Sequence, residues 1–277
     1  MHFTKYTGLG NDFVFLDGET AQAVTNPSVL AQQLCDRRFG VGADGLVLLL
    51  PSDKADVRMQ IINSDGSEAE MCGNASRCVP LHLYRRGRCH RKEVTLETLA
   101  GIIRTEIVDE FCGLVRVDMG PARLTRAEIP MEGRGDEQAV NFLLEACGRT
   151  FTATAVSMGN PHLVIFTDDV EKVPLQEWGP ELEKHSLFPR KTNVEFVQVL
   201  NEYAVRMRVW ERGAGITRAC GTGACATAVA GVLTGKTSPK VTVKLDGGDL
   251  QIEWPKRQHV WMTGLAQELF TGEFTAL

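Results

Sequence analysis

Cys72-Gly73-Asn74 recurs 148 positions later as Cys220-Gly221-Thr222, each time just before a segment with helical character. Other landmarks recur at almost the same offset: Gly10-Asn11 as Gly159-Asn160, and Asn63 as Glu211. A repeat of this length is too long for a solenoid. It predicts two duplicated domains related by a pseudo-two-fold axis. One Cys-Gly element would then lie on each wall of the cleft between them, which would form the active site.

The pattern of side chains predicts an α+β fold in which short strands outnumber helices. Helices are expected over 27–36, 73–86, 179–185 and 221–234. The last of these has almost no polar face, and a helix that is apolar all round is normally buried. We therefore expect each domain to be a β-barrel-like sheet wrapped around one buried helix. The expected strands are 1–6, 11–17, 45–50, 57–63, 93–98, 101–108, 113–118, 139–145, 150–158, 162–167, 194–200, 203–210, 240–245, 249–254 and 258–263.

The boundary between the two halves is expected near Gly120-Pro121. The first domain would span residues 1–119 and the second 120–265, with 266–277 returning to the first. At 277 residues the chain is long enough for two domains that each have a core.

Composition favours a soluble cytoplasmic protein with a small-molecule ligand. The net charge of −5 and a pI near 5.8 give no general attraction to nucleic acids or anionic membranes. Neither a signal-peptide pattern nor an apolar run of membrane-spanning length occurs in the sequence. The basic stretch 85–92 follows an expected helix end, so we interpret it as a solvated face rather than a nucleic-acid patch.

Eight cysteines occur, and their spacing does not predict a metal site. Zinc ligands normally form CxxC or CxxH pairs, and this sequence has none. In a reducing cytoplasm an even count does not imply disulfides either. Six of the eight are expected to be small buried apolar side chains. Cys72 and Cys220 differ because each precedes a helix start and each matches the other across the duplication.

These two helix starts indicate the chemistry. The first turn of a helix has free backbone N–H groups and the positive end of the helix dipole, which together suit a carboxylate. The same field is expected to lower the pKa of a cysteine there. A thiolate on one face of an amino acid could take the α-proton while a thiol on the other face returns one. This reaction needs no metal and no cofactor.

The chain resembles the diaminopimelate epimerase family, the cofactor-independent amino-acid epimerases of lysine and peptidoglycan synthesis. The resemblance extends over essentially the whole length and is carried by seven motifs in order. These are Tyr6-Thr7-Gly8-Leu9-Gly10-Asn11-Asp12-Phe13, Gly40-Val41-Gly42-Ala43-Asp44-Gly45, Asn63-Ser64-Asp65-Gly66-Ser67-Glu68, Met71-Cys72-Gly73-Asn74, Gly159-Asn160-Pro161-His162, Trp210-Glu211-Arg212-Gly213-Ala214-Gly215 and Ala219-Cys220-Gly221-Thr222-Gly223-Ala224-Cys225-Ala226.

The resemblance implies a set of site residues. Cys72 and Cys220 would be the paired acid and base, and His162 and Glu211 would tune them. The substrate implied is diaminopimelate, interconverted between its LL and meso forms by a homodimer. Arg212 suits its distal carboxylate and Glu211 its ammonium group. The backbone cradle for the reacting carboxylate would be Gly73, Asn74, Gly221 and Thr222, and the side chains gripping the substrate Asn11, Asn63, Asn160, Asn193, Glu211 and Arg212.

Three positions depart from the family pattern. Gly45 replaces a glutamine that contacts the substrate in some members, Ala75-Ser76 replace a common Gly-Ala, and Ile216 replaces a usual glutamate. None of the three removes a catalytic group.

Three alternatives stay open. Gly221-Thr222-Gly223 opens a relaxed dinucleotide fingerprint, but the segment 213–219 before it is not the buried strand that a Rossmann site requires. A non-enzymatic binding protein of the same fold would not need both cysteines. The nearest alternative is another cofactor-independent racemase of this fold, acting on proline, histidine or another amino acid.

Overall fold

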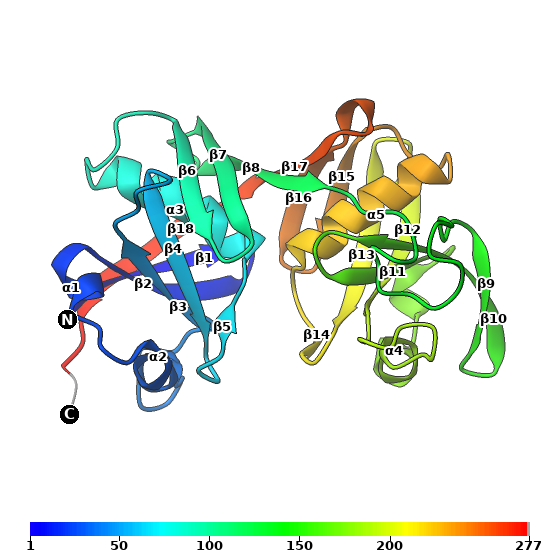
Figure 1. Ribbon diagram of the computed structural model, residues 1–277, viewed down its shortest axis with the longest axis horizontal. Helices are drawn as coiled ribbons and strands as arrows, with labels where there is room; N and C mark the ends of the chain where they lie inside the picture. The colour runs from blue at the N-terminus through cyan, green and yellow to red at the C-terminus, as the bar shows by residue number, and fades with distance from the viewer. Residues whose placement is uncertain (276–277) are drawn as a thin grey trace. The chain divides into compact units, whose positions relative to one another are not determined.

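The computed structural model describes residues 1–275, and the chain divides into two compact units. Unit 1 comprises Met1–Asp118 and the C-terminal segment that begins at Thr263; unit 2 comprises Met119–Met262. Two strands carry the chain across this division, β8 (Leu114–Pro121) and β17 (His259–Leu265). Figure 1 shows strands and helices in both units, as expected for an α+β fold.

Unit 1 is built on a mixed sheet. Along the sheet, β18 pairs with β1, then β2, β3, β4, β6, β7 and β8 follow, and the short β5 pairs with β4. The strands are β1 (His2–Gly8), β2 (Asn11–Asp17), β3 (Gly45–Leu50), β4 (Val57–Asn63), β5 (Glu68–Ala69), β6 (Glu93–Thr98), β7 (Gly101–Asp109) and β18 (Gln267–Glu273). The helices are α1 (Gly18–Gln22), α2 (Pro27–Cys35) and α3 (Gly73–Arg85).

Unit 2 contains a second mixed sheet, in the order β9, β10, β11, β12, β13, β15 and β16, with β14 beside β13. The strands are β9 (Phe142–Ala146), β10 (Arg149–Ser157), β11 (Pro161–Phe166), β12 (Asn193–Asn201), β13 (Ala204–Glu211), β14 (Gly215–Ile216), β15 (Lys240–Leu245) and β16 (Gly248–Glu253). The helices are α4 (Leu175–Glu183) and α5 (Gly221–Leu233), with 3-10 turns η1 (Val170–Lys172) and η2 (Pro255–Arg257).

The two sheets have the same pairing scheme, which confirms the predicted duplication of the fold. From β1 to β7 the successive pairings are antiparallel, parallel, antiparallel, parallel and antiparallel. From β10 to β16 the same five pairings occur in the same order. The parallel steps are crossovers, and they carry α2 and α3 in unit 1 and α4 and α5 in unit 2.

Each sheet curves around one helix, as predicted. Helix α3 contacts β1 and β18 at one end of its sheet and β6 and β7 near the other. Helix α5 contacts β10 and β16, together with the strands between them. Alanine, glycine and valine make up most of α5, and all of its residues from Gly223 to Gly231 are buried. Because these side chains are small, the strands can pack closely on every side of the helix.

The predicted elements agree with the structure to within a few residues, but six elements were not predicted. These are the helix α1, the strands β5, β14 and β18, and the 3-10 turns η1 and η2. Strand β18 pairs antiparallel with β1, from His2 opposite Glu273 to Thr7 opposite Gln267. The expectation that 266–277 returns to the first domain includes residues 276 and 277, which lie outside the described residues.

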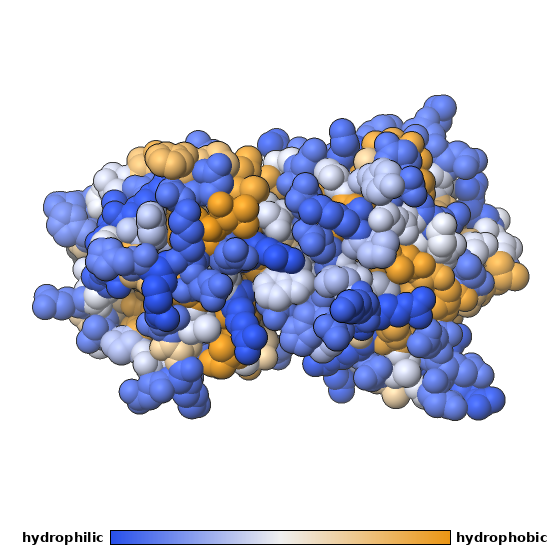
Figure 2. All heavy atoms as spheres, turned by 90° about the horizontal axis from the view of Figure 1, so that it is seen from above, coloured by the Kyte–Doolittle hydropathy of each residue, from blue (hydrophilic) through white to orange (hydrophobic). Residues whose placement is uncertain are grey.

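Within residues 1–275, no helix combines the length and the apolar character that crossing a membrane requires. Figure 2 shows that hydrophilic side chains cover much of the face in view, with smaller apolar patches between them. Such patches are usual on the surface of folded proteins.

Candidate active site

In each unit the predicted residues come from the same end of the sheet. In unit 1, Gly45 at the start of β3 pairs with Phe13 in β2 and with Asn63 at the end of β4. Asn11, Asp44 and Asn63 therefore lie at one edge, close to the start of α3. We call Asn11, Asp44, Asn63, Cys72 and Asn74 the Cys72 cluster.

Unit 2 repeats this arrangement. His162 in β11 pairs with Asn193 at the start of β12, and the next residue of β12 pairs with Trp210 near the end of β13. The start of α5 follows at the same edge. We call Asn160, His162, Glu195, Glu211 and Cys220 the Cys220 cluster.

Cys72 is the N-cap residue of α3. Its backbone is extended, with φ −139°, and the helix begins at Gly73. The carbonyl of Cys72 accepts the N–H of Ser76 at 2.9 Å and the Ser76 hydroxyl at 2.9 Å. Ser76, one of the departures from the family pattern, therefore anchors the cap. The N–H groups of the first turn remain available for an anion, as a helix start allows.

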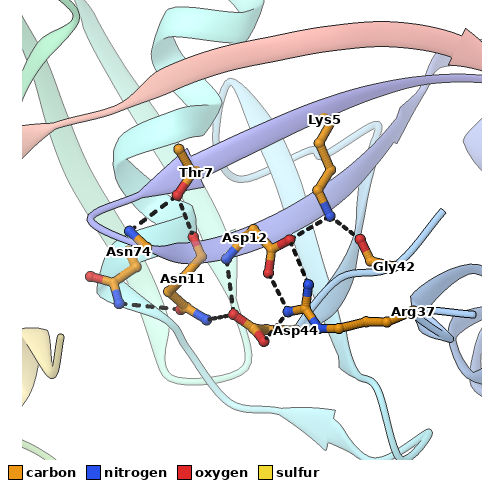
Figure 3. A network of polar contacts seen from close by, with 9 residues as sticks. Lys5, Thr7, Asn11, Asp12, Arg37, Gly42, Asp44 and Asn74 are labelled. Carbon is orange, nitrogen blue, oxygen red and sulfur yellow. Dashed lines mark hydrogen bonds and ion pairs between the residues drawn. The ribbon is translucent and has the colours of Figure 1, made fainter. Parts of the chain in front are cut away.

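The side-chain amides of Asn11 and Asn74 contact each other (Figure 3), and that of Asn11 also lies beside Cys72. The Asn11 carbonyl oxygen lies 3.8 Å from Cys72 Sγ and accepts a hydrogen bond from Asn74 Nδ2 at 3.2 Å. Asn74 Oδ1 accepts from the buried Arg77 guanidinium at 3.0 Å. Asn11 Nδ2 donates to Asp44 Oδ2 at 2.7 Å.

A network of charged side chains, which includes residues of β1 and of the loop after α2, supports the two asparagines Asn11 and Asn74 (Figure 3). Arg37 donates to Asp44 at 2.8 Å and to Asp12 at 2.7 Å. The buried Lys5 ammonium lies 2.7 Å from the Asp12 carboxylate and also donates to the Gly42 carbonyl. Burial alone would raise the pKa of Asp12, but the hydrogen bonds from Arg37 and Lys5 lower it to about 2.

Two further positions of unit 1 complete this edge. Asn63 is exposed, and its Nδ2 donates to Ser67 Oγ at 3.0 Å. Gly45 is buried, and a Cβ added there would stand 3.0 Å from the Ile62 carbonyl oxygen. Any larger side chain at this position would push on strand β4.

Cys220 is the N-cap residue of α5 and is buried. Its Sγ accepts the Gly223 N–H at 3.4 Å and lies 3.6 Å from the Thr222 hydroxyl. A Cβ added at Gly223 would stand 2.6 Å from Glu195 Oε1 and 3.1 Å from Cys220 Sγ. Because Gly223 has no side chain, the Cys220 thiol and the Glu195 carboxylate can both lie close to it.

A buried pair of His162 and Glu195 lies beneath this cap. His162 Nδ1 is 2.7 Å from Glu195 Oε1, and both side chains are fully buried. The other ring nitrogen is 3.0 Å from Asn160 Oδ1. Both ring nitrogens of His162 are therefore within hydrogen-bond distance of a side-chain oxygen atom. Burial raises the pKa of Glu195, and the charge of His162 opposes that rise.

The loop after β13 holds the predicted distal residues. Glu211 accepts a hydrogen bond from the Thr217 hydroxyl. The Arg212 N–H donates to Asn193 Oδ1 at 2.9 Å, and its exposed guanidinium donates to the Arg190 carbonyl at 3.0 Å. Asn193 Nδ2 also donates to the protein, to the Pro161 carbonyl at 2.9 Å. The amide of Asn193 therefore orients the Arg212 backbone and links it to β11.

Buried Glu183 in α4 accepts hydrogen bonds from the loop after β13. Its carboxylate accepts from Trp210 Nε1 at 2.7 Å and from the Gly213 N–H at 3.3 Å. These two hydrogen bonds fix the residues that directly precede and follow Glu211 and Arg212.

The expected lowering of the cysteine pKa at a helix start is wrong for Cys220. Burial raises its pKa well above the ordinary value, and the charges of Glu211 and Glu195 raise it further. The hydrogen bonds from Thr222 and the Gly223 N–H act in the opposite direction but are outweighed. The thiol form of Cys220 is therefore favoured.

The expectation that the other six cysteines are buried is correct for three of them and wrong for three. Cys35, Cys78 and Cys225 are buried as expected, and burial raises the pKa of Cys78 to about 12. Cys112, by contrast, is exposed, and Cys89 and Cys147 are partly exposed. Among the described residues, no group of three or more His, Cys, Asp or Glu side chains forms a metal-binding arrangement.

Sequence reasoning gave no role to four side chains that organise the two clusters, Asp44, Arg37, Arg77 and Glu195. One signal could have identified Glu195, because it is a charged residue inside the apolar run of β12, and buried charges must be paired. Asp44 lies within a quoted motif, but its contact with Asn11 depends on the parallel register of β2 and β3.

Comparison with solved structures defines the class of fold. A probable proline racemase from Agrobacterium radiobacter K84 superposes with a TM-score of 0.70 at 17% identity, covering 99% of this chain and 92% of that one. A Bacillus anthracis protein of the PhzF phenazine-biosynthesis family superposes at 0.71 and 16% identity, covering 100% and 99%. At such identities the likeness establishes the fold alone, a fold that includes racemases and epimerases.

Sequence comparison identifies the family. The Diaminopimelate epimerase family pattern matches residues 3–125 and 154–269. A diaminopimelate epimerase from Pelotomaculum thermopropionicum is 57% identical over 279 residues, and one from Moorella thermoacetica is 54% identical over 277, each with 99% of both chains covered. The chain belongs to the diaminopimelate epimerase family, a family of isomerases.

Proposed function

We propose that this protein interconverts LL- and meso-2,6-diaminopimelate, with Cys72 and Cys220 as the acid and base at one α-carbon. The observation that carries the proposal is the pair of cysteine N-caps at equivalent places in two units of equal topology. Family membership supports the choice of substrate. The resemblance further predicts a cytoplasmic homodimer that serves lysine and peptidoglycan precursor synthesis without a cofactor.

The proposed reaction is a two-base proton transfer that uses one cysteine from each domain. The thiolate of one cysteine takes the α-proton and becomes a thiol, which leaves a carbanion on the substrate. The thiol of the other cysteine gives its proton to the opposite face and becomes a thiolate. The α-carbon is inverted, and the two cysteines have exchanged protonation states. For the reverse reaction they exchange roles.

Binding of the reacting carboxylate is assigned to the two helix starts. The N–H groups at Gly73, Asn74, Gly221 and Thr222 carry the positive ends of α3 and α5. Fixed dipoles of this kind also stabilise the negative charge that develops when the α-proton leaves. The raised pKa of Cys220 fits a group that donates a proton first in one direction.

The far end of the substrate is assigned to Asn63, Asn193, Glu211 and Arg212, with Asn11 and Asn160 closer to the reacting carbon. A guanidinium binds a carboxylate through two parallel hydrogen bonds, and a carboxylate such as Glu211 pairs with an ammonium group. This grip favours a long substrate with a second amino-acid end over proline or histidine.

The test is an assay of the purified protein on LL-diaminopimelate, meso-diaminopimelate and a panel of single amino acids that includes proline and histidine. We expect conversion between the two diaminopimelate isomers and none of the panel to be racemised at a comparable rate. Racemisation of a panel amino acid without turnover of diaminopimelate would establish the alternative racemase instead. Binding without any isomer conversion would establish a non-enzymatic protein.

A further inference from the structure

An unbroken line of polar contacts runs from the interior of unit 1 past Cys72 to its surface. Figure 3 shows the part from Asn74 through Asn11 and Asp44 to Arg37. It begins at buried Arg77, which donates to Asn74 Oδ1 at 3.0 Å. Asn74 Nδ2 donates to Asn11 Oδ1 at 3.2 Å, and Asn11 Nδ2 donates to Asp44 Oδ2 at 2.7 Å. The line ends where Arg37 donates to Asp44 Oδ1 at 2.8 Å.

The charged groups at its two ends determine how both amides point. A guanidinium can only donate, so the oxygen of Asn74 must face Arg77. An ionised carboxylate can only accept, so the nitrogen of Asn11 must face Asp44. The remaining atoms then form the bond from Asn74 Nδ2 to Asn11 Oδ1. If either amide were turned over, two donors or two acceptors would face each other.

This orientation has a consequence for Cys72. Because its nitrogen is held by Asp44, Asn11 presents its carbonyl oxygen to Cys72 Sγ, at 3.8 Å. A carbonyl oxygen accepts from a thiol, whereas an amide NH₂ would donate to a thiolate. Which atom faces the sulfur therefore decides which protonation state of Cys72 the amide stabilises.

We propose that Asp44, Arg37 and Arg77 are positioning residues that hold the carbonyl oxygen of Asn11 toward Cys72 and so favour its thiol over its thiolate. The proposal rests on the function proposed above only in taking Cys72 as the reacting group. The family resemblance assigns none of these three residues a role.

Arg37 is the residue of this line that lies at the surface, so it can be substituted without disturbing the protein interior. Its side chain is 59% exposed, and it bridges Asp44 and Asp12. The other ionisable groups near the line are Lys5 on β1 and Cys78 on α3. A substitution of Arg37 therefore loosens the anchor with little change in packing.

The test measures the titration of the Cys72 thiol itself. The rate of iodoacetamide alkylation at Cys72 is followed against pH by peptide mass spectrometry, with Cys220 in the same digest as an internal reference. In Asp44→Asn the partner can donate as well as accept, so Asn11 is free to turn its NH₂ toward the sulfur. We expect the Cys72 titration to move down by about half a pH unit or more, with Cys220 unchanged.

The direction in which the Cys72 titration shifts in Arg37→Gln distinguishes a positioning effect from a direct effect of charge. Loosening the anchor moves the Cys72 titration down, whereas loss of a positive charge by itself would move it up. The double-variant cycle gives a second separation: in an Asn11→Ala background, Asp44→Asn should add no further shift. Thermal unfolding of each variant confirms that the fold is intact, and Arg37→Gln serves if Asp44→Asn does not fold.

Two results would overturn the proposal. One is an upward shift, or none, in Arg37→Gln; the other is the same shift for Asp44→Asn with and without Asn11. The measurement needs no substrate, so its outcome does not depend on whether diaminopimelate is turned over. Conversely, a failed epimerase assay with the expected thiol shifts would reject the proposed function and leave the positioning intact.

Discussion

The Cys72 and Cys220 clusters occupy equivalent places in two units of equal topology, yet their polar surroundings differ. Cys72 is partly exposed and faces a neutral carbonyl oxygen, which is held by ion pairs that reach the surface. Cys220 is buried, accepts a backbone N–H, and has the carboxylates of Glu195 and Glu211 nearby. Duplication has kept the position of the thiol and changed what controls its proton.

This difference shows how one scaffold can control two similar groups by different means. Both environments favour the thiol form, but different neighbours set each proton affinity, so the two can be changed separately. In the Cys220 cluster the control is buried charge; in the Cys72 cluster it is the orientation of an amide.

Loss of either thiol should have the largest effect. Cys72→Ala and Cys220→Ala should each lower the rate of epimerisation by about a thousandfold or more, because general acid–base groups contribute on that scale. The rates are measured by chiral chromatography of diaminopimelate, and circular dichroism checks the fold. Cys78→Ala is the matched control, a buried cysteine on α3 that should stay active. Full activity in either single variant would contradict the proposal that both thiols are required for the reaction.

Loss of the buried carboxylate should come next, and only the Cys220 side should respond. Glu195→Gln removes the charge that pairs with His162 and should lower kcat/KM by about ten- to hundredfold, the scale of a hydrogen bond to a charged group. The alkylation pH profile of Cys220 should move down because a nearby negative charge is lost, while that of Cys72 stays in place. Glu177→Gln, an exposed residue of α4, is the control. A profile that moves equally at both cysteines would contradict separate control.

Arg212 should matter for specificity rather than for either thiol. Arg212→Lys cannot form the same two parallel hydrogen bonds, so kcat/KM for diaminopimelate should fall about tenfold. Steady-state kinetics on diaminopimelate and on short monocarboxylate amino acids give the comparison, with Arg134→Lys as an exposed control. Solvent deuterium should still enter the α-position of whatever is turned over. An unchanged kcat/KM would favour the alternative racemase.

The smallest effect should be on stability at low pH, and it concerns the network beneath the Cys72 cluster. The pKa of Asp12 is lowered to about 2 in the folded protein. A lowered pKa stabilises the fold at pH values above the unfolded pKa, near 4, and this contribution disappears as the pH falls toward 2. After screening by solvent it is about 1 kcal/mol.

Denaturant unfolding of the wild type and Asp12→Asn tests this sign. The difference between their free energies of unfolding should be constant near neutral pH and shrink between about pH 4 and pH 2. A difference that grows in that window would mean that the ionised carboxylate does not stabilise the fold.

Much of this structure follows from the sequence because its signals are local. The period-two strands, the apolar segment 221–233 and the repeated Cys-Gly caps each depend on neighbouring residues, and all were located to within a few positions. Strand β18 was missed as an element because its pairing with β1 joins the two ends of the chain. The helix α1 is only five residues long, too short for a periodic pattern.

The site is predicted less completely for the same reason. Cysteines at helix starts can be identified from a motif, but their proton affinity depends on groups that come from other strands. Glu195 reaches Cys220 only through the packing of β12 against α5. Asp44 reaches Asn11 only through the parallel register of β2 and β3. The helix dipole predicted a lowered pKa for Cys220, whereas burial and two carboxylates raise it.

The central claim is that two different groups act on opposite faces of one carbon, and deuterium labelling tests it most directly. LL-diaminopimelate is converted in D₂O, and both isomers are analysed by mass spectrometry while less than about a tenth has reacted. The account predicts that the meso product carries one solvent deuterium at the inverted carbon, while the remaining LL substrate keeps its hydrogen. Product that retains the original hydrogen, or LL substrate that exchanges before any product forms, would show a single base and contradict the account.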